Sequence, residues 1–152
     1  METMTQSTVE REVAIAASPE TVWRFLVEPE LAGRWMGDWH RLEPEPGGAY
    51  RVEVLPGAVA AGEIVELDPP RRLIMTWGWE QEGASIGAGA TTISFELVPS
   101  GDGTLLRFTH TALPSAEAVE RHAHGWDHYL ARLARAATDG DAGRDPWLDG
   151  IT

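Results

Sequence analysis

The chain has 152 residues, of which 43% are hydrophobic and 24% charged, and its formal net charge is −12. This length suits one domain that buries a core without cross-links. The acidic charge argues against nucleic acid or an anionic membrane surface as partners, since both require a basic face. The absence of cysteine excludes disulfides and thiolate chemistry, and the absence of lysine excludes a side-chain Schiff base.

The N-terminal residues 1–12 are polar and acidic and do not resemble a signal peptide. No stretch of the sequence approaches the roughly 20 apolar residues that a membrane span requires. The sequence therefore predicts a cytoplasmic protein without a membrane partner.

The first elements are a strand and two short helices. Apolar and polar residues alternate over 9–17, which predicts a strand with one buried face. Ser18, Pro19 and Glu20 then supply an N-cap hydroxyl, a proline for the first turn and an acid near the helix start. A second short helix is predicted within residues 28–36.

Six further segments of alternating residues follow, separated by turn-forming residues such as 46–48 and 100–103. The predicted strands are 39–43, which is weak, and 49–55, 60–67, 72–80, 91–98 and 104–111. The glycine-rich stretch 81–90 is expected to form a loop over one end of the sheet.

Apolar residues recur in steps of three and four over 115–138, which predicts an amphipathic helix roughly 33 Å long. Pro114 and Gly140 flank it as start and stop signals. The predicted inward stripe consists of Val119, His122, Ala123, Trp126, Leu130, Leu133 and Ala137. The acidic, glycine-rich tail 139–152 is expected to be extended, with Trp147 docking on the surface.

Strands segregated from helices predict an α+β domain with an antiparallel sheet. We expect one domain over residues 1–138, followed by the tail 139–152. Its curved sheet of about six to seven strands would wrap round the long C-terminal helix, with two short helices after the first strand.

Several motifs occur in a familiar order along the chain. They are Ala17-Ser18-Pro19-Glu20-Thr21-Val22-Trp23, Leu31 to Trp35, Gly48-Ala49-Tyr50-Arg51, Gly62 to Leu73, Thr76-Trp77, Thr109-His110, Gly125-Trp126, Tyr129-Leu130 and Leu133. With these motifs the chain, over about residues 7–138, resembles the START-like (SRPBCC, birch-pollen-allergen-like) superfamily, which has the helix-grip fold. Within it, the chain is most similar to the bacterial branch related to the activator of the heat-shock protein 90 ATPase.

The resemblance implies a cavity between the sheet and the long helix, used in the superfamily for lipids, polyketides or other apolar molecules. The positions that it implies for the cavity lining are Trp35, Trp39, Trp77, Trp79, His110, His122 and Trp126. Seven tryptophans in 152 residues is a high content, and aromatic walls suit a planar ligand. The alternative is that these side chains only fill the core.

Two histidines are the candidate catalytic residues. An inward imidazole at His110 or His122 could orient a ligand oxygen or transfer a proton, although a buried, hydrogen-bonded histidine is an equally simple interpretation. His124 and His128 have a spacing that can hold a metal, but they lie off the apolar stripe and lack an evident third ligand. We therefore predict neither a metal site nor a cofactor.

Three functions remain open from the sequence. The first is a binding protein for a small apolar or aromatic molecule. The second is an enzyme of the polyketide cyclase/dehydratase type that uses a cavity histidine as general acid or base, so whether the chain is an enzyme stays undecided. The third is a chaperone-associated interaction protein. An exposed strand edge could also support a homodimer.

Overall fold

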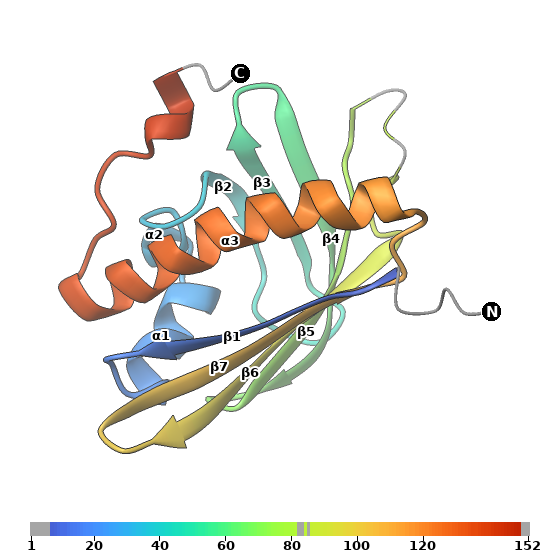
Figure 1. Cartoon of the computed structure of the whole chain (residues 1–152). Coiled ribbons are helices and arrows are strands. Elements are labelled where there is room, and N and C mark those ends of the chain that lie inside the picture. Colours follow the sequence, from blue (N-terminus) through green and yellow to red (C-terminus); the bar gives the residue numbers. More distant parts are fainter. Residues whose placement is uncertain (1–6, 82–83, 85, 150–152) are drawn as a thin grey trace.

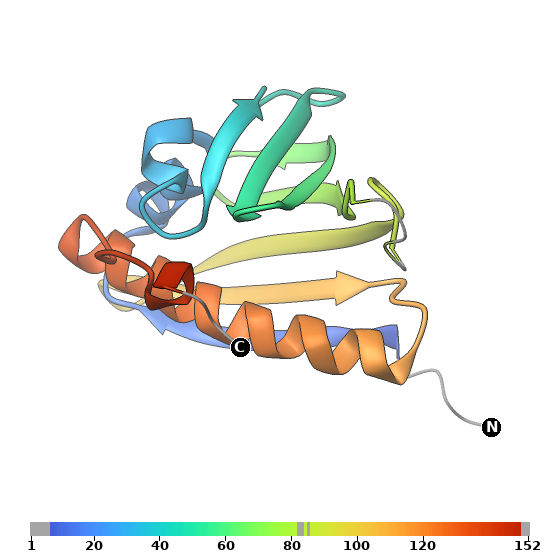
Figure 2. The same cartoon turned by 90° about the horizontal axis from the view of Figure 1, so that it is seen from above.

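The computed structural model describes residues 7–81, 84 and 86–149. Seven strands form one antiparallel sheet in the order β1-β7-β6-β5-β4-β3-β2, and the long helix α3 crosses its concave face (Figures 1 and 2). The elements are β1 Val9–Ile15, α1 Pro19–Val27, α2 Pro29–Ala32, β2 Asp38–Leu42, β3 Ala49–Leu55, β4 Ala58–Asp68, β5 Arg72–Trp77, β6 Thr91–Ser100, β7 Gly103–Thr111 and α3 Ala116–Asp139. This confirms the predicted α+β helix-grip fold.

The sheet consists of antiparallel connections between successive strands and one pairing between strands far apart in the sequence. Strands β2 to β7 follow one another as antiparallel neighbours, whereas β1 pairs with β7, with Val9 opposite His110. Burial alternates along the central strands, so that Ile93, Phe95 and Leu97 of β6 point into the core. The alternation seen in the sequence therefore identifies the concave face.

Side-chain caps fix the helix ends. Ser18 Oγ accepts a hydrogen bond from Thr21 N at 3.2 Å, and Ser115 Oγ accepts one from Ala118 N at 3.1 Å. Gly140 ends α3 in the left-handed conformation, with φ of 92°. Both predicted N-termini and the predicted C-terminus of the long helix are confirmed.

The buried side of α3 is rotated from the predicted stripe. It consists of Ala118, Trp126, Tyr129, Leu130, Leu133, Ala136 and Ala137. Val119, His122 and Ala123 are only partly buried. The reason is that this N-terminal part of α3 packs on a smaller cluster around Val9, Ile86 and Leu113 instead of on the main core.

Two further boundaries differ from the sequence-based expectation. Strand β5 ends at Trp77 instead of continuing to Glu80, and Trp79 forms only isolated bridges to Ala60 and Gly87. The tail contains a 3₁₀ helix, Pro146–Asp149, instead of being extended throughout. No helix in the described part of the chain is both long and apolar enough to cross a membrane.

Candidate functional site

Five of the seven predicted cavity residues gather where α3 crosses the ends of β5 and β7. Trp77 is the centre of this aromatic cluster: its ring centroid lies 5.1 Å from that of Trp126 and 5.6 Å from that of Trp79. The imidazoles of His110 and His122 are 5.0 Å apart and nearly perpendicular. We call these five residues, Trp77, Trp79, His110, His122 and Trp126, the aromatic cluster.

His110 is completely buried, and both of its ring nitrogens have partners. Its Nδ1 accepts a hydrogen bond from Trp126 Nε1 at 3.0 Å, so the ring proton is on Nε2. That Nε2–H then donates to Thr91 Oγ1 at 2.8 Å, and the Thr91 hydroxyl donates to the carbonyl oxygen of Trp77 at 2.7 Å. The chain of bonds is complete only with a neutral imidazole.

His122 has the opposite tautomer. A carbonyl oxygen can only accept, so the contact of 2.8 Å between His122 Nδ1 and Ala118 O places the proton on Nδ1. Nε2 is then free to accept from Trp79 Nε1 at 3.1 Å. This bond fixes the Trp79 ring against the helix, at the border between the aromatic cluster and solvent.

Both imidazoles are held in the neutral form. Burial lowers the pKa of His110 to about 3, and His122 nearby lowers it further. Burial also lowers the pKa of His122, against the raising effect of its bond to Ala118 O. Protonating either imidazole would place a second N–H group opposite the tryptophan N–H that the ring now accepts from. Both nitrogens of each ring are therefore already engaged, and neither ring has a nitrogen free for proton transfer.

Two spaces meet at Trp79 and His122. An inner cavity of about 60 Å³ is lined by Met36, Val54, Trp77, Trp79, His122, Gly125, Trp126 and Tyr129. An outer pocket of about 480 Å³ is lined by Ala58, Trp79, Gln81, Ala84, Ile86, Arg121 and His122. Ligand sites commonly measure roughly 300–1,000 Å³, so the outer pocket has the necessary size and the inner cavity does not.

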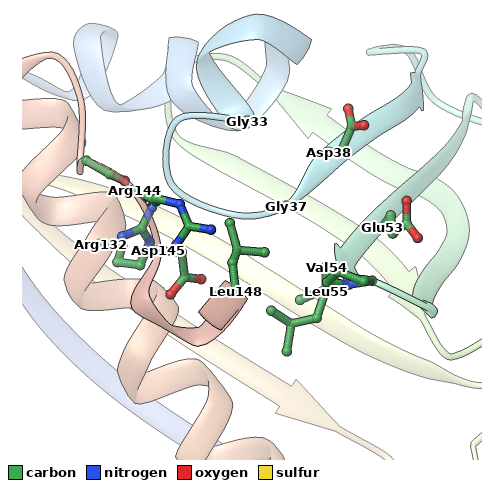
Figure 3. Close-up of a pocket in the computed structure, with 12 residues that line it drawn as sticks. Gly33, Gly37, Asp38, Glu53, Val54, Leu55, Arg132, Arg144, Asp145 and Leu148 are labelled. Atoms are coloured by element: carbon green, nitrogen blue, oxygen red, sulfur yellow. Dashed lines mark hydrogen bonds between the residues drawn. The ribbon is translucent and has the colours of Figure 1, made fainter. Parts of the chain in front are cut away.

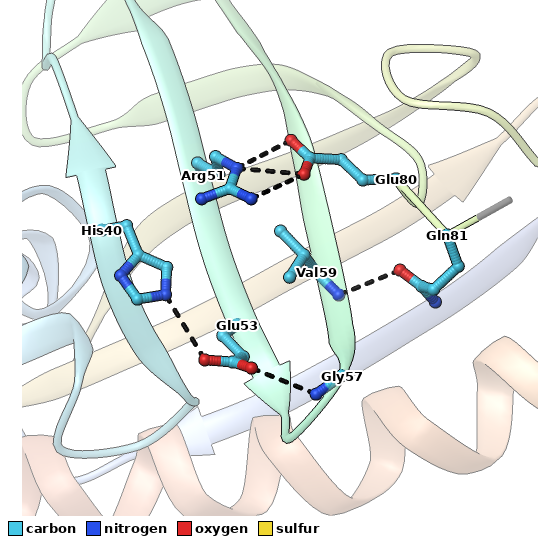
Figure 4. Close-up of polar contacts among 7 residues, drawn as sticks. All are labelled: His40, Arg51, Glu53, Gly57, Val59, Glu80 and Gln81. Atoms are coloured by element: carbon cyan, nitrogen blue, oxygen red, sulfur yellow. Dashed lines mark hydrogen bonds and ion pairs between the residues drawn. The ribbon is translucent and has the colours of Figure 1, made fainter.

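Polar contacts on β3 and β4 hold the segment beside the outer pocket in place (Figure 4). The Arg51 guanidinium pairs with Glu80 at 2.9 Å, and Gln81 Oε1 accepts from Val59 N at 3.0 Å. Trp79 N donates to Ile86 O at 3.0 Å. Sequence reasoning missed Ile86, Ala58 and Arg121, because nothing local indicates that this glycine-rich segment folds back beside Trp79.

The other two predicted residues, Trp35 and Trp39, do not join the aromatic cluster. Trp35 is buried and donates its Nε1–H to Phe25 O at 2.8 Å. Trp39 donates its Nε1–H to Met36 O at 2.9 Å and packs against Tyr50, with ring centroids 5.8 Å apart. Both border a void of only about 10 Å³. Trp35 has the environment of a core residue, whereas Trp39 is partly buried and also lines a surface pocket of about 620 Å³ beside α2 and the tail.

A separate pocket of about 320 Å³ lies between the tail and β3 (Figure 3). Leu148 and Arg144 of the tail, Val54 and Leu55 of β3 and Arg132 of α3 contribute to its lining. The sequence pattern did not predict this pocket, since its two sides are brought together only when the tail folds back.

Among the described residues, one group of side chains has the composition of a metal site. Asp38, His40 and Glu53 offer ligand atoms within 4.8 Å of one another. All three lie on the exposed surface of β2 and β3, where Glu53 already accepts from Gly57 N and contacts His40 at 3.4 Å (Figure 4). The contacts of Glu53 account for the positions of Glu53 and His40, and all three residues lie outside both the inner cavity and the outer pocket.

His124 and His128, which have helical i, i+4 spacing, both contact the tail. The ring of Trp147 stacks on His128 with centroids 3.7 Å apart and also on His124 at 5.3 Å. His128 Nε2 contacts Asp145 Oδ1 at 2.8 Å. The helical spacing of these histidines therefore provides a platform for the tail.

Comparison with known proteins identifies relatives. The sequence profile of the family described as Activator of Hsp90 ATPase homolog 1-like protein matches residues 16–138. No functionally curated protein matches the chain. An AHSA1-like protein from Rhizobium etli is 41% identical, with a TM-score of 0.70, over 95% of this chain and 88% of that chain.

Two other solved structures show the same fold at lower identity. The Aha1 dimer from Colwellia psychrerythraea is 21% identical, with a TM-score of 0.76, over 88% of this chain and 97% of that chain. DynU16, a protein of the dynemicin biosynthetic locus, is 22% identical, with a TM-score of 0.78. That match covers 91% of this chain and 50% of DynU16, so the chain spans half the length of that protein.

The profile match and the 41% identity agree with the arrangement of sheet and helix. The chain belongs to the Activator of Hsp90 ATPase homolog 1-like family.

Proposed function

We propose that this protein binds a small apolar or aromatic molecule at the outer pocket, against the face formed by Trp79 and His122. The observation that carries the proposal is the position of these two residues, which line both the outer pocket and the inner cavity. A ligand that displaced the Trp79 ring would gain access to the apolar wall of Trp77 and Trp126. Aromatic stacking there would add about 0.5–1.5 kcal/mol to the hydrophobic contribution.

A buried donor supports an oxygen-bearing ligand. Within the described part of the chain, no acceptor lies within hydrogen-bond distance of the Nε1–H of Trp77, which is 2% exposed. An unpaired buried donor costs about 1–3 kcal/mol. A hydroxyl or carbonyl oxygen on an aromatic ligand could accept from it, which would favour a phenol or aryl ketone over a plain hydrocarbon.

The histidine geometry favours binding over catalysis. A general base needs a lone pair directed at the substrate, and both lone pairs of the neutral rings already accept from Trp79 and Trp126. A reaction of the cyclase or dehydratase type would require His122, the more accessible of the two, to release Trp79 first. We therefore place catalysis second to binding.

Association with another protein is the remaining alternative. The family description refers to activation of the Hsp90 ATPase, and the Colwellia relative is a dimer. Neither a chaperone-associated role nor a homodimer depends on a ligand in the outer pocket. Size-exclusion chromatography with light scattering, alone and with a purified Hsp90, would detect either assembly.

A titration with 2-naphthol, naphthalene and decanoate tests the binding proposal. We expect saturable changes in the amide NMR signals of Trp79, Ile86 and His122, with 2-naphthol binding more tightly than naphthalene. The variant Trp79→Ala should weaken binding at least about fivefold, since it removes the aromatic wall. The matched control Trp39→Phe should leave binding unchanged, because Trp39 packs against Tyr50 instead. Absence of saturable changes with all three compounds would refute the proposal.

A further inference from the structure

Residues 140–149 fold back along α3 and are fixed by polar contacts at both ends of the segment. Near its start, Arg34 donates to Gly140 O at 3.1 Å and Arg132 donates to Gly143 O at 2.8 Å. Near its end, Asp145 Oδ1 accepts from Trp147 N at 2.9 Å while also contacting His128. The segment is thus held in one place by α3 and by the turn that follows α2.

This segment lies over α3 in the view from above (Figure 2), and it lines a pocket together with β3. Two inner-cavity residues lie directly beneath it. Tyr129 lines the inner cavity and packs edge-on against Trp147, with ring centroids 5.7 Å apart. Val54 lines the inner cavity and also the pocket beside Leu148 (Figure 3).

The contacts that hold residues 140–149 lie partly in solvent, so water can replace them when the segment detaches. Trp147 is only half-buried, and Leu148 is 43% exposed. The ion pair of Arg144 with Asp149, at 2.7 Å, lies on the surface. The segment also follows the region matched by the family profile, which ends at residue 138.

We infer that residues 140–149 act as a lid on the inner cavity, which closes the opening between α3 and β3 and restricts ligand entry. The inference rests on the proposed function, because it concerns access to the same site. When the lid detaches, Tyr129 and Val54 lose their cover and the inner cavity joins the space beside β3. Ligand would then enter from the α3–β3 side as well as past Trp79.

Association kinetics of 2-naphthol with the full-length chain test the lid. Trp147→Ala removes the ring that covers Tyr129, and Asp145→Ala removes the carboxylate that contacts His128. Each of these two substitutions should raise the association rate of 2-naphthol at least about fivefold. That is the change expected when the fraction of molecules with a detached lid increases from about a fifth to nearly all. Arg135→Ala is the control, because Arg135 is exposed on α3 and lies outside residues 140–149 and outside the lining of the inner cavity and of the pocket beside β3. It should leave the rate unchanged.

A double variant shows where the additional binding occurs. In the Trp147→Ala background, Trp79→Ala should weaken 2-naphthol binding as it does in the unmodified chain. If Trp79→Ala does not weaken binding in this background, 2-naphthol binds to the uncovered face of α3, and the lid proposal is wrong. Unchanged association rates in both lid variants would overturn it as well, with the binding proposal intact. No binding to any variant would refute both.

Discussion

The indole N–H of Trp126 donates to Nδ1 of His110 across 3.0 Å, and this bond joins the middle of α3 to the last strand of the sheet. It is supported on the sheet side by the hydroxyl of Thr91, which bridges His110 and the backbone of Trp77. Four elements, α3, β7, β6 and β5, are thus connected inside the core by a chain of hydrogen bonds. Such a network positions a helix more precisely than apolar packing alone.

Replacing His110 by alanine should lower the free energy of unfolding by about 3–4 kcal/mol. The change leaves a cavity and deprives the N–H of Trp126 of its acceptor, and both effects destabilise a core. Urea denaturation followed by circular dichroism would measure the difference. His40→Ala, on the exposed surface of β2, is the control and should alter stability by less than about 0.5 kcal/mol. A loss of similar size in the two variants would argue against the network.

Stability should fall as the pH decreases from about 6.5 toward 3. The pKa of His110 is lowered from 6.5 to about 3. Between these pH values His110 is therefore protonated in the unfolded chain and neutral in the folded chain. The free energy of unfolding is therefore unaffected by this group above pH 6.5, and it declines by about 1.4 kcal/mol per pH unit below that pH. His122 contributes in the same direction.

This pH effect can be measured between pH 7 and 5, before the carboxylates titrate. Urea midpoints at several pH values should show a steeper dependence for the unmodified chain than for His110→Gln, which cannot titrate. Equal slopes for the two proteins would show that His110 titrates normally and would contradict the buried neutral imidazole.

Gly125→Ala should raise the free energy of unfolding by about 0.5–1 kcal/mol, because glycine is a poor helix former. Gly125 lies inside α3, and a Cβ added there would meet no atom within 4 Å. It borders the inner cavity, so the larger Gly125→Leu should reduce 2-naphthol binding. If Gly125→Ala destabilises the protein instead, the space beside the Gly125 Cα is occupied.

Gly78→Ala should lower the free energy of unfolding by about 2–3 kcal/mol, within the range for a backbone clash. A Cβ at Gly78 would collide with the carbonyl oxygen of Gly87, so the backbone beside Ile86 would have to move. Gly87→Ala is a matched control on the other side of this contact, because its Cβ would have open space. Thermal denaturation of the two variants should separate them clearly, and similar melting temperatures would disprove the close approach.

The sequence predicted the order of elements because period-two alternation and helix caps are local signals. Ser18 and Gly140 cap helices as expected, and the strand boundaries agree within about two residues except in β5. The long helix begins where Pro114 indicated, with Ser115 as its N-cap. Strand β5 was predicted to be too long because the residues after Trp77 keep an alternating pattern. Their pairing is interrupted by the approach of Gly87, which no local pattern records.

The candidate site could be predicted only in part. Inward-facing aromatic positions on β5, β7 and α3 were correctly assigned to one region, which brought Trp77, His110 and Trp126 together. Alternation indicates the face of a residue but not its neighbours across the cavity, so it did not show that Trp39 packs against Tyr50, which in turn stacks on Trp77. The volume that remains depends on the conformations of the packed side chains, which the sequence does not specify.

Strand β2 lies at one edge of the sheet, is five residues long and carries an irregularity between Trp39 and Arg41. Charged and polar side chains alternate with its few apolar ones, and Asp38 and His40 are exposed. A short, bulged and charged edge is a poor template for another chain's backbone. This edge therefore disfavours strand-by-strand pairing with another chain, which a longer, flat edge would invite.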